Sequence, residues 1–406
     1  IHANDDLPSY FHWELEFPVT FLINYGFDIV IGNPPWGQKA IKFSDTDKMF
    51  FEINYPSSIQ GILDIFRFFI ERSIAIAKSN AFFANVLPDI ILLKNYDSTR
   101  KLILDILTLT KIDHWGMAFK NVNLDCCTIL GIKKFCEPNH MVNAIIHEND
   151  KTTLNKIPQN QFIRLDGYKL NLHLKNDTMA IIDKLANSES FGDFFDPHEG
   201  IHSGNIRNKL FIDERIGQYA QKLIFGRDEI RKYYIKWNGK WVNYDKSIIN
   251  RNDGEYAGLG KPEYFERDKI IVRRTGDYIL AAVDCDKFYF TNNVFVCLPK
   301  KGSQIDIRYA LACLNSTLST WYYRAIQPRK GKLFAELKIN VLKKLPLKCV
   351  NEKDQAPLIN IVNQIISMKK NDVHSDTSAL ENQIDQIIYK LYSLTREEIA
   401  VIESDK

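Results

Sequence analysis

The sequence lacks the patterns that would tie it to a structural metal or to a membrane. Its seven cysteines show no CxxC motif and no paired Cys/His spacing, which argues against a zinc site. It shows no signal peptide, and no apolar run is long enough to span a bilayer. We therefore expect a cytoplasmic protein without a metal or a membrane partner, in which Cys126 and Cys127 are buried, reduced thiols.

An excess of charge of one sign is also missing. The formal net charge is +3 over 406 residues, so the charge of the whole chain says little about its partners. The length suffices for two or three domains. Apolar runs alternate with amphipathic helical stretches over residues 27 to 135, and this alternation predicts an α/β fold with a doubly wound sheet.

The most informative short segment is Asn33-Pro34-Pro35-Trp36, which directly follows the apolar run of residues 27–32. We expect this run to be a buried strand of a parallel sheet, because it is apolar almost throughout. The two prolines end strand pairing and stiffen the loop that follows. A loop at the carboxyl end of a central strand is where open α/β sheets place their chemistry.

These four residues resemble motif IV of the amino-group methyltransferases of the NPPW class, which transfer a methyl group from S-adenosylmethionine to an exocyclic amine of a base. The resemblance implies that the Asn33 side-chain oxygen and the Pro34 carbonyl accept hydrogen bonds from the amine and stabilise its developing positive charge. Pro35 would help to hold these acceptors in place. Trp36 would offer a ring face to a base flipped out of the duplex.

The chain up to residue 135 is similar, in order, to the later motifs of the same family. By this resemblance Phe119, in the loop before the strand that begins near Asp125, stacks on the flipped base. Asp64 lies where the family has a polar residue near the cofactor, although an aspartate at the start of a helix is also a common cap. We expect His114 to be structural, because no other ligand is spaced near it in the sequence.

A Gly-rich cofactor loop is missing before residue 27. In this family the loop, an acidic residue followed by FxGxG, usually precedes the NPPW motif. We therefore expect residues 1–150 to form the C-terminal half of the catalytic domain, with a partial Rossmann-like methyltransferase sheet. The residues that bind S-adenosylmethionine would lie upstream of residue 1 or on a partner, and the chain alone would be an inactive fragment.

From residue 151 onward, short strands are separated by basic and aromatic loops. Several phrases there, among them residues 223–233 and 269–276, resemble the TaqI-like C-terminal specificity domain, which recognises a DNA sequence for its methyltransferase. We expect residues 151–350 to be an α+β target-recognition domain that binds double-stranded DNA. Residues 351–406 are expected to form a C-terminal helical segment.

Five basic residues of this domain are candidates for DNA contacts. Arg273 and Arg274 end an expected strand and could read base edges, because arginine pairs well with guanine. Arg329, Lys330 and Lys332 belong to a dense basic stretch that would bind backbone phosphates.

The sequence therefore predicts part of a bacterial, site-specific adenine-N6 DNA methyltransferase of a type IIG restriction–modification or phage-defence system. The choice of adenine rests on the family resemblance alone, so an N4-cytosine methyltransferase stays open. NPPW-type loops also serve methyltransferases that act on RNA guanine or protein glutamine. A DNA-specificity subunit without catalysis is a third possibility. We find no PD…ExK nuclease pattern, so any cleavage activity would reside upstream.

Overall fold

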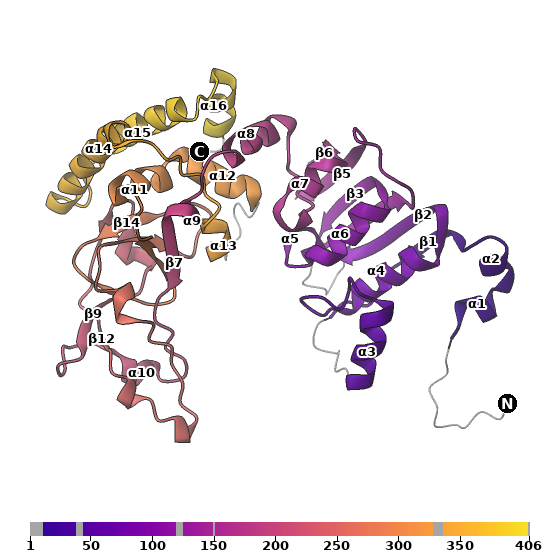
Figure 1. Ribbon diagram of the computed structural model, residues 1–406, viewed down its shortest axis with the longest axis horizontal. Coiled ribbons are helices and arrows are strands. Elements are labelled where there is room, and N and C mark those ends of the chain that lie inside the picture. Colours follow the sequence, from indigo (N-terminus) through magenta and orange to yellow (C-terminus); the bar gives the residue numbers. More distant parts are fainter. Residues whose placement is uncertain (1–10, 38–43, 119–124, 149–150, 328–335, 405–406) are drawn as a thin grey trace. The chain divides into compact units, whose positions relative to one another are not determined.

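The protein is described here by a computed structural model that covers residues 11–37, 44–118, 125–148, 151–327 and 336–404 (Figure 1). The chain divides into two compact units, residues 1–176 and residues 177–406. Residue 150, where the sequence suggested a boundary, lies between two paired strands of the first unit. The helices after residue 350 belong to the second unit.

A six-stranded mixed sheet forms the centre of the first unit. Strands β1 and β2 are parallel, β4 is antiparallel to both β2 and β3, and β5 is parallel to β3 and antiparallel to β6. The fold class is therefore the expected α/β arrangement with a methyltransferase-like sheet. In spatial order the strands are β1 (Phe27–Gly32), β2 (Ala77–Pro88), β4 (Cys126–Ile132), β3 (Thr108–Gly116), β5 (Met141–Glu148) and β6 (Lys151–Pro158).

Helix α4 packs on β1 and β2 because one face of the helix is apolar, and its Phe66, Ile70 and Ile74 are buried. Helix α6 packs beside α4. Cys126 and Cys127 are buried in β4, as expected. The helices of this unit are α1 (Trp13–Glu16), α2 (Pro18–Leu22), α3 (Asp45–Asn54), α4 (Ile65–Ile76), α5 (Ile90–Leu93), α6 (Asp97–Ile106), α7 (Gln159–Arg164) and the 3₁₀ turn η1 (Asp166–Tyr168).

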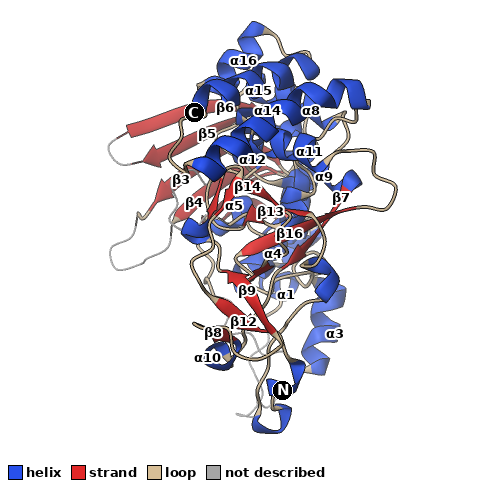
Figure 2. Ribbon diagram, turned by 90° about the vertical axis from the view of Figure 1, so that its left-hand side faces the viewer, coloured by secondary structure: helices blue, strands red, loops and turns tan. Residues whose placement is uncertain are grey.

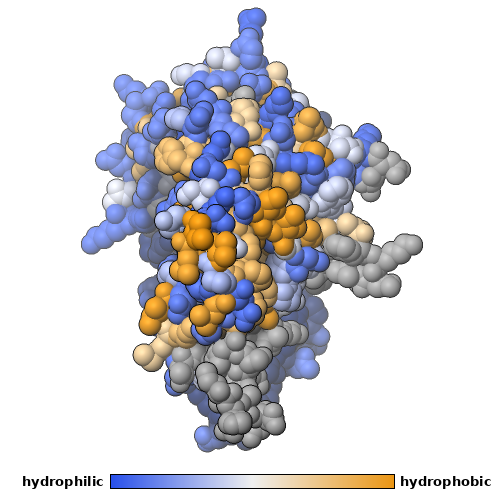
Figure 3. All heavy atoms as spheres, turned by 90° about the vertical axis from the view of Figure 1, so that its right-hand side faces the viewer, coloured by the Kyte–Doolittle hydropathy of each residue, from blue (hydrophilic) through white to orange (hydrophobic). Residues whose placement is uncertain are grey.

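The expectation that β1 is a buried central strand is wrong. Among the described strands β1 pairs only with β2, so it forms one edge of the sheet. Ile29 and Ile31 point to the face opposite α4 and are 58% and 76% exposed, and Phe82 of β2 is 58% exposed. Figure 3, which views the molecule from the side on which β1 lies in Figure 1, shows apolar side chains gathered there. An apolar run thus signals burial only where neighbouring elements exist to cover both faces.

The second unit contains two four-stranded sheets and a short hairpin. The first sheet is antiparallel, and its central strands β13 and β16 are almost wholly buried. It consists of β14 (Ala281–Asp284), β13 (Lys269–Arg273), β16 (Val294–Pro299) and β7 (Phe195–Glu199). The other strands are β15 (Tyr289–Phe290), β9 (Ala220–Ile224), β12 (Trp241–Asn243) and β8 (Phe211–Ile212), with the hairpin β10 (Ile230–Arg231) and β11 (Tyr234–Ile235).

Helices cover one end of this unit, above strands β13 and β14 in Figure 2, with α11 packed against β14 and α14. Thr395 and Glu398 form a capping box at the start of the last helix. None of the helices in the described ranges is long and apolar enough to cross a membrane. The α-helices are α8 (Asn176–Ala186), α9 (Phe191–Phe194), α10 (Arg207–Leu210), α11 (Ile307–Asn315), α12 (Thr317–Ile326), α13 (Ile339–Leu342), α14 (Glu352–Asn371), α15 (Ser378–Leu391) and α16 (Arg396–Glu403), and the 3₁₀ turns are η2 (Arg227–Glu229), η3 (Lys246–Ile248), η4 (Arg251–Asp253) and η5 (Pro262–Tyr264).

Candidate active site

The loop Asn33–Trp36 leaves the sheet at the carboxyl end of β1, as the sequence predicts. Asn33 is exposed, Pro34 is buried and Trp36 is half-buried. The strand and the buried Pro34 therefore fix the loop on the side of the core, while the Asn33 side chain is accessible to a substrate. This arrangement suits a group that must accept hydrogen bonds from an incoming amine.

Asp64 fixes the far end of this loop. The backbone N–H of Gly37 donates to Asp64 Oδ1 over 3.1 Å, and the hydroxyl of Tyr96 donates to Asp64 Oδ2 over 3.3 Å. Asp64 occupies the N-cap position of α4, but its side chain makes no capping hydrogen bond. Asp64 is 2% exposed. Its carboxylate therefore accepts a hydrogen bond from the loop and does not cap the helix.

A buried arginine, Arg67, holds the segment of the chain that precedes Asp64. Arg67 is completely buried, and it donates to Thr99 Oγ1 over 2.7 Å and to the Ser57 carbonyl over 2.7 Å. It also donates to the Ile62 carbonyl, two residues before Asp64. Burial lowers the pKa of Arg67, whereas neighbouring acidic groups act in the opposite direction. These bonds fix the segment that leads into α4.

Phe119, the expected stacking residue, lies outside the described residues. Three titratable side chains lie at neighbouring strand ends: Asp89 follows β2, His114 lies near the end of β3, and Asp125 precedes β4. One potential ligand atom of each lies within 4.8 Å of the others, so the three could together approach one metal ion. The sequence could not show this grouping, because the three residues come from different strands.

Arg273 and Arg274 lie at the end of β13, where the sequence places them. Arg273 lies over the ring of Tyr278, with 5.2 Å from Cζ to the ring centre. Arg274 is held by two carboxylates, Glu199 at 3.3 Å and Glu336 at 3.6 Å. Both arginines are half-buried, and the structure shows no hydrogen-bond partner for either Nε atom.

Arg329, Lys330 and Lys332 lie outside the described residues, but the chain on either side of them is described. Before them, Arg324 donates to the Asp277 carbonyl over 3.0 Å. After them, the backbone N–H of Leu337 donates to the Arg274 carbonyl over 2.7 Å. Both flanks of the basic stretch are therefore anchored beside the end of β13, close to the two candidate base-reading arginines.

The sequence reasoning missed a polar cavity of about 480 Å³ in the second unit. The Arg207 guanidinium lies over the rings of Phe211 and Phe225, at 5.2 Å and 5.3 Å from their centres. Asn293 also lines the cavity, as do Lys240 and Asp213, which form an ion pair with each other. Arginine stacked on aromatic rings, with further donors around it, suits contacts to a polyanion or to a base. No short motif marks this grouping in the sequence.

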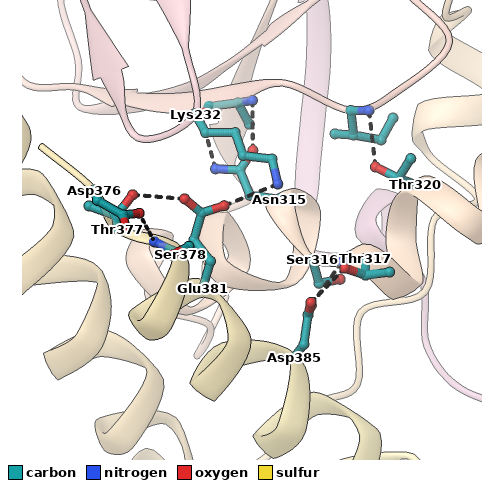
Figure 4. Close-up of polar contacts among 12 residues, drawn as sticks. Lys232, Asn315, Ser316, Thr317, Thr320, Asp376, Thr377, Ser378, Glu381 and Asp385 are labelled. Atoms are coloured by element: carbon teal, nitrogen blue, oxygen red, sulfur yellow. Dashed lines mark hydrogen bonds and ion pairs between the residues drawn. The ribbon is translucent and has the colours of Figure 1, made fainter. Parts of the chain in front are cut away.

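A larger cavity of about 660 Å³ lies among α12, α15 and the β10–β11 hairpin (Figure 4). Three of its charged side chains are engaged by neighbours. Lys232 pairs with Glu381 over 3.2 Å, and Asp385 accepts from the backbone N–H of Thr317 over 2.8 Å and from its hydroxyl over 2.5 Å. These contacts tie α15 to α12 and to the hairpin, so this cavity has a structural explanation.

Two families match separate parts of the chain. Residues 2–119 match the Eco57I restriction-modification methylase family. Residues 221–347 match the TaqI-like C-terminal specificity domain. The first match contains the Asn33–Trp36 loop, and the second contains Arg273, Arg274 and the basic stretch.

Two individual proteins extend this comparison. A Methanocaldococcus jannaschii protein described as a type II restriction enzyme and methyltransferase is 24% identical over 414 residues, which cover 94% of this chain and 32% of that protein. The solved type IIL restriction-modification enzyme MmeI, in complex with DNA, has a similar fold, with a TM-score of 0.61 and 12% identity over 92% of this chain and 55% of that one. The chain thus spans about a third and about half of their lengths.

Proposed function

The chain carries an Eco57I restriction-modification methylase region and a TaqI-like C-terminal specificity domain, and we propose that it forms part of an adenine-N6 DNA methyltransferase that uses S-adenosylmethionine. The enzyme would act on double-stranded DNA in the cytoplasm, within a restriction–modification system. The observation that carries this proposal is the Asn33–Trp36 loop, with Asn33 exposed at the carboxyl end of β1 and the loop anchored at Asp64.

The loop supplies the acceptor side of the reaction. The lone pair of an aromatic amine is delocalised into its ring, so the nitrogen is a poor nucleophile. The Asn33 side-chain oxygen and the Pro34 carbonyl would accept its two N–H groups, draw the nitrogen toward tetrahedral geometry and stabilise the positive charge that forms. Trp36, with Phe119, would hold the flipped base by stacking.

S-adenosylmethionine would supply the methyl group, and we propose that its main binding loop lies on a segment or partner outside this sequence. No strand followed by a Gly-rich loop precedes β1 in the described part of the chain. The free edge of β1 and the exposed Ile29, Ile31 and Phe82 offer an apolar surface for such a segment. By itself this chain would not transfer methyl groups.

The second unit would recognise the DNA. The flanks of the basic stretch are anchored at the end of β13, so phosphate contacts from Arg329, Lys330 and Lys332 would fix the register of the duplex there. Arg273 would be the better base reader of the two arginines, because Arg274 is already held by Glu199 and Glu336.

Modified-base sequencing of host DNA would test this function. The complete enzyme, meaning this chain together with the part that carries the cofactor loop, would be expressed beside its Asn33→Ala variant. We expect N6-methyladenine at one recurrent sequence, lost in Asn33→Ala and retained in the control Asn54→Ala, which changes an exposed asparagine on α3. N4-methylcytosine would keep the mechanism and correct the base. Methylation retained in Asn33→Ala would end the catalytic assignment of Asn33. Methylation in neither protein would favour a non-DNA substrate or a specificity subunit without catalysis.

A further inference from the structure

The first end of the Asn33–Trp36 loop rests on a buried amide. Gly32, the last residue of β1, pairs with Asn85 of β2. A Cβ atom on Gly32 would lie 2.5 Å from Asn85 Oδ1, so only glycine lets this amide lie against the backbone. Asn85 is 2% exposed, and its Nδ2 has no hydrogen-bond partner in the described structure.

An asparagine at this position needs an explanation. Phe83 and Leu87, two residues before and after it on the same buried face of β2, are apolar. An amide whose donor is left without a partner destabilises the folded state, and leucine would fill a similar volume without that cost. A buried polar group without a partner in a native structure calls for an explanation, and a role in catalysis is one of those known. Here Asn85 pairs with Gly32, the residue that directly precedes Asn33.

The second end of the loop rests on a buried carboxylate. Gly37 follows Trp36 directly, and its backbone N–H donates to Asp64 Oδ1. Tyr96, which is completely buried in α6's N-terminal flank, donates to the other carboxylate oxygen and so fixes its rotation. The second end of the loop is therefore held by a hydrogen bond, and the first end by the close packing of the Asn85 amide against Gly32. Both side chains come from elements far away in the sequence.

We propose that Asn85 and Asp64 are positioning residues for methyl transfer, one at each end of the Asn33–Trp36 loop. This rests on the proposed function of the loop. Two prolines make the loop stiff, so fixing its ends fixes the direction of the Asn33 oxygen and the Pro34 carbonyl. A misplacement of about 1 Å can lower a rate by about 100-fold. The two anchors would thus act on the rate of the chemical step and leave DNA binding unchanged.

Steady-state kinetics of the complete enzyme would test this proposal with four variants. We expect Asp64→Leu to lower kcat by about 100-fold and Asn85→Leu by about tenfold, each with the KM for DNA unchanged. Asp64→Asn keeps an acceptor for Gly37 and should recover most of the rate. Phe83→Leu, on the same face of β2, controls for lost core packing and should lower stability but not kcat.

Hydrogen exchange at the Trp36 and Gly37 amides, measured on this chain, tests the anchors without catalysis. Asp64→Leu and Asn85→Leu should raise these exchange rates by about tenfold, since each loosens the loop locally. Unchanged exchange and unchanged kcat would overturn the proposal, as would a loss of kcat that Phe83→Leu shares. If the wild-type enzyme methylates no base, but both variants still raise the exchange rates of the Trp36 and Gly37 amides, the proposed function is wrong. Asp64 and Asn85 would then still be shown to fix the loop.

Discussion

The two units differ in how completely the strands of their sheets are covered. In the first unit the edge strand β1 pairs with only one described strand, β2, and carries Ile31, which is 76% exposed. In the second unit Val296 of β16 is completely buried, and the strand has a neighbour on each side. The unit that carries the candidate active site therefore has an exposed apolar surface on which another segment could pack. The unit that would read DNA buries the apolar side chains of β16 within itself.

The buried ion pair of the second unit gives the sharpest test of its closed core. Lys269 and Asp284 lie 2.5 Å apart with both side chains completely buried. Burial lowers the pKa of Lys269 and raises the pKa of Asp284, because both charges have lost their water. Asp284→Ala would leave the Lys269 charge buried without its partner and should lower the free energy of unfolding by about 3–5 kcal/mol.

Native-state hydrogen exchange of β13 amides in the second unit would measure this loss separately from the first unit. The matched control is Asp28→Ala on the edge strand, whose pair with Lys78 is largely exposed. We expect no detectable change from that control in the exchange of β2 amides. An Asp284→Ala effect as small as the control would show that the second core is more open to water than the structure indicates.

Much of the first unit could be predicted from the sequence, because local periodicity determines each element. The apolar runs around β1, β2 and β4 are strands, and the helical pattern after residue 62 is α4. Helix α6 ends at Ile106 because the chain enters β3 at Thr108. Boundaries of this kind depend on which neighbour a residue meets.

The contacts that define the candidate site could not be predicted in the same way. The loop Asn33–Trp36 was visible as a motif, but its anchors were not. Asp64 reaches Gly37, and Asn85 reaches Gly32, only because β2 pairs beside β1 and α4 packs over both strands. The edge position of β1 was missed for the same reason, because strand order is a property of the whole sheet.

The proposed DNA binding gives a second comparison between the units. Replacing Arg329, Lys330 and Lys332 together with alanine should weaken the binding of duplex DNA. It should also make the dependence of log K on log salt shallower by about 0.9 for each phosphate contact that is lost. Lys151→Ala/Lys156→Ala, which removes two exposed charges from β6 of the first unit, is the control and should leave the slope unchanged. An equal change of slope in both variants would place the DNA surface on the first unit as well.

The smallest effect tests the open face of the first unit. Ile31→Thr replaces an exposed side chain and should change the stability of this chain by less than about 0.5 kcal/mol. Val296→Thr buries a hydroxyl in β16 and should lower the free energy of unfolding by about 1–3 kcal/mol.

If a cofactor-binding segment covers β1, Ile31→Thr should become destabilising once that segment is present, whereas the effect of Val296→Thr should stay the same. Thermal unfolding of both variants, in this chain and in the complete enzyme, would measure the change. A cost for Ile31→Thr that stays small in the complete enzyme would mean that β1 remains an edge strand and that the cofactor loop docks elsewhere.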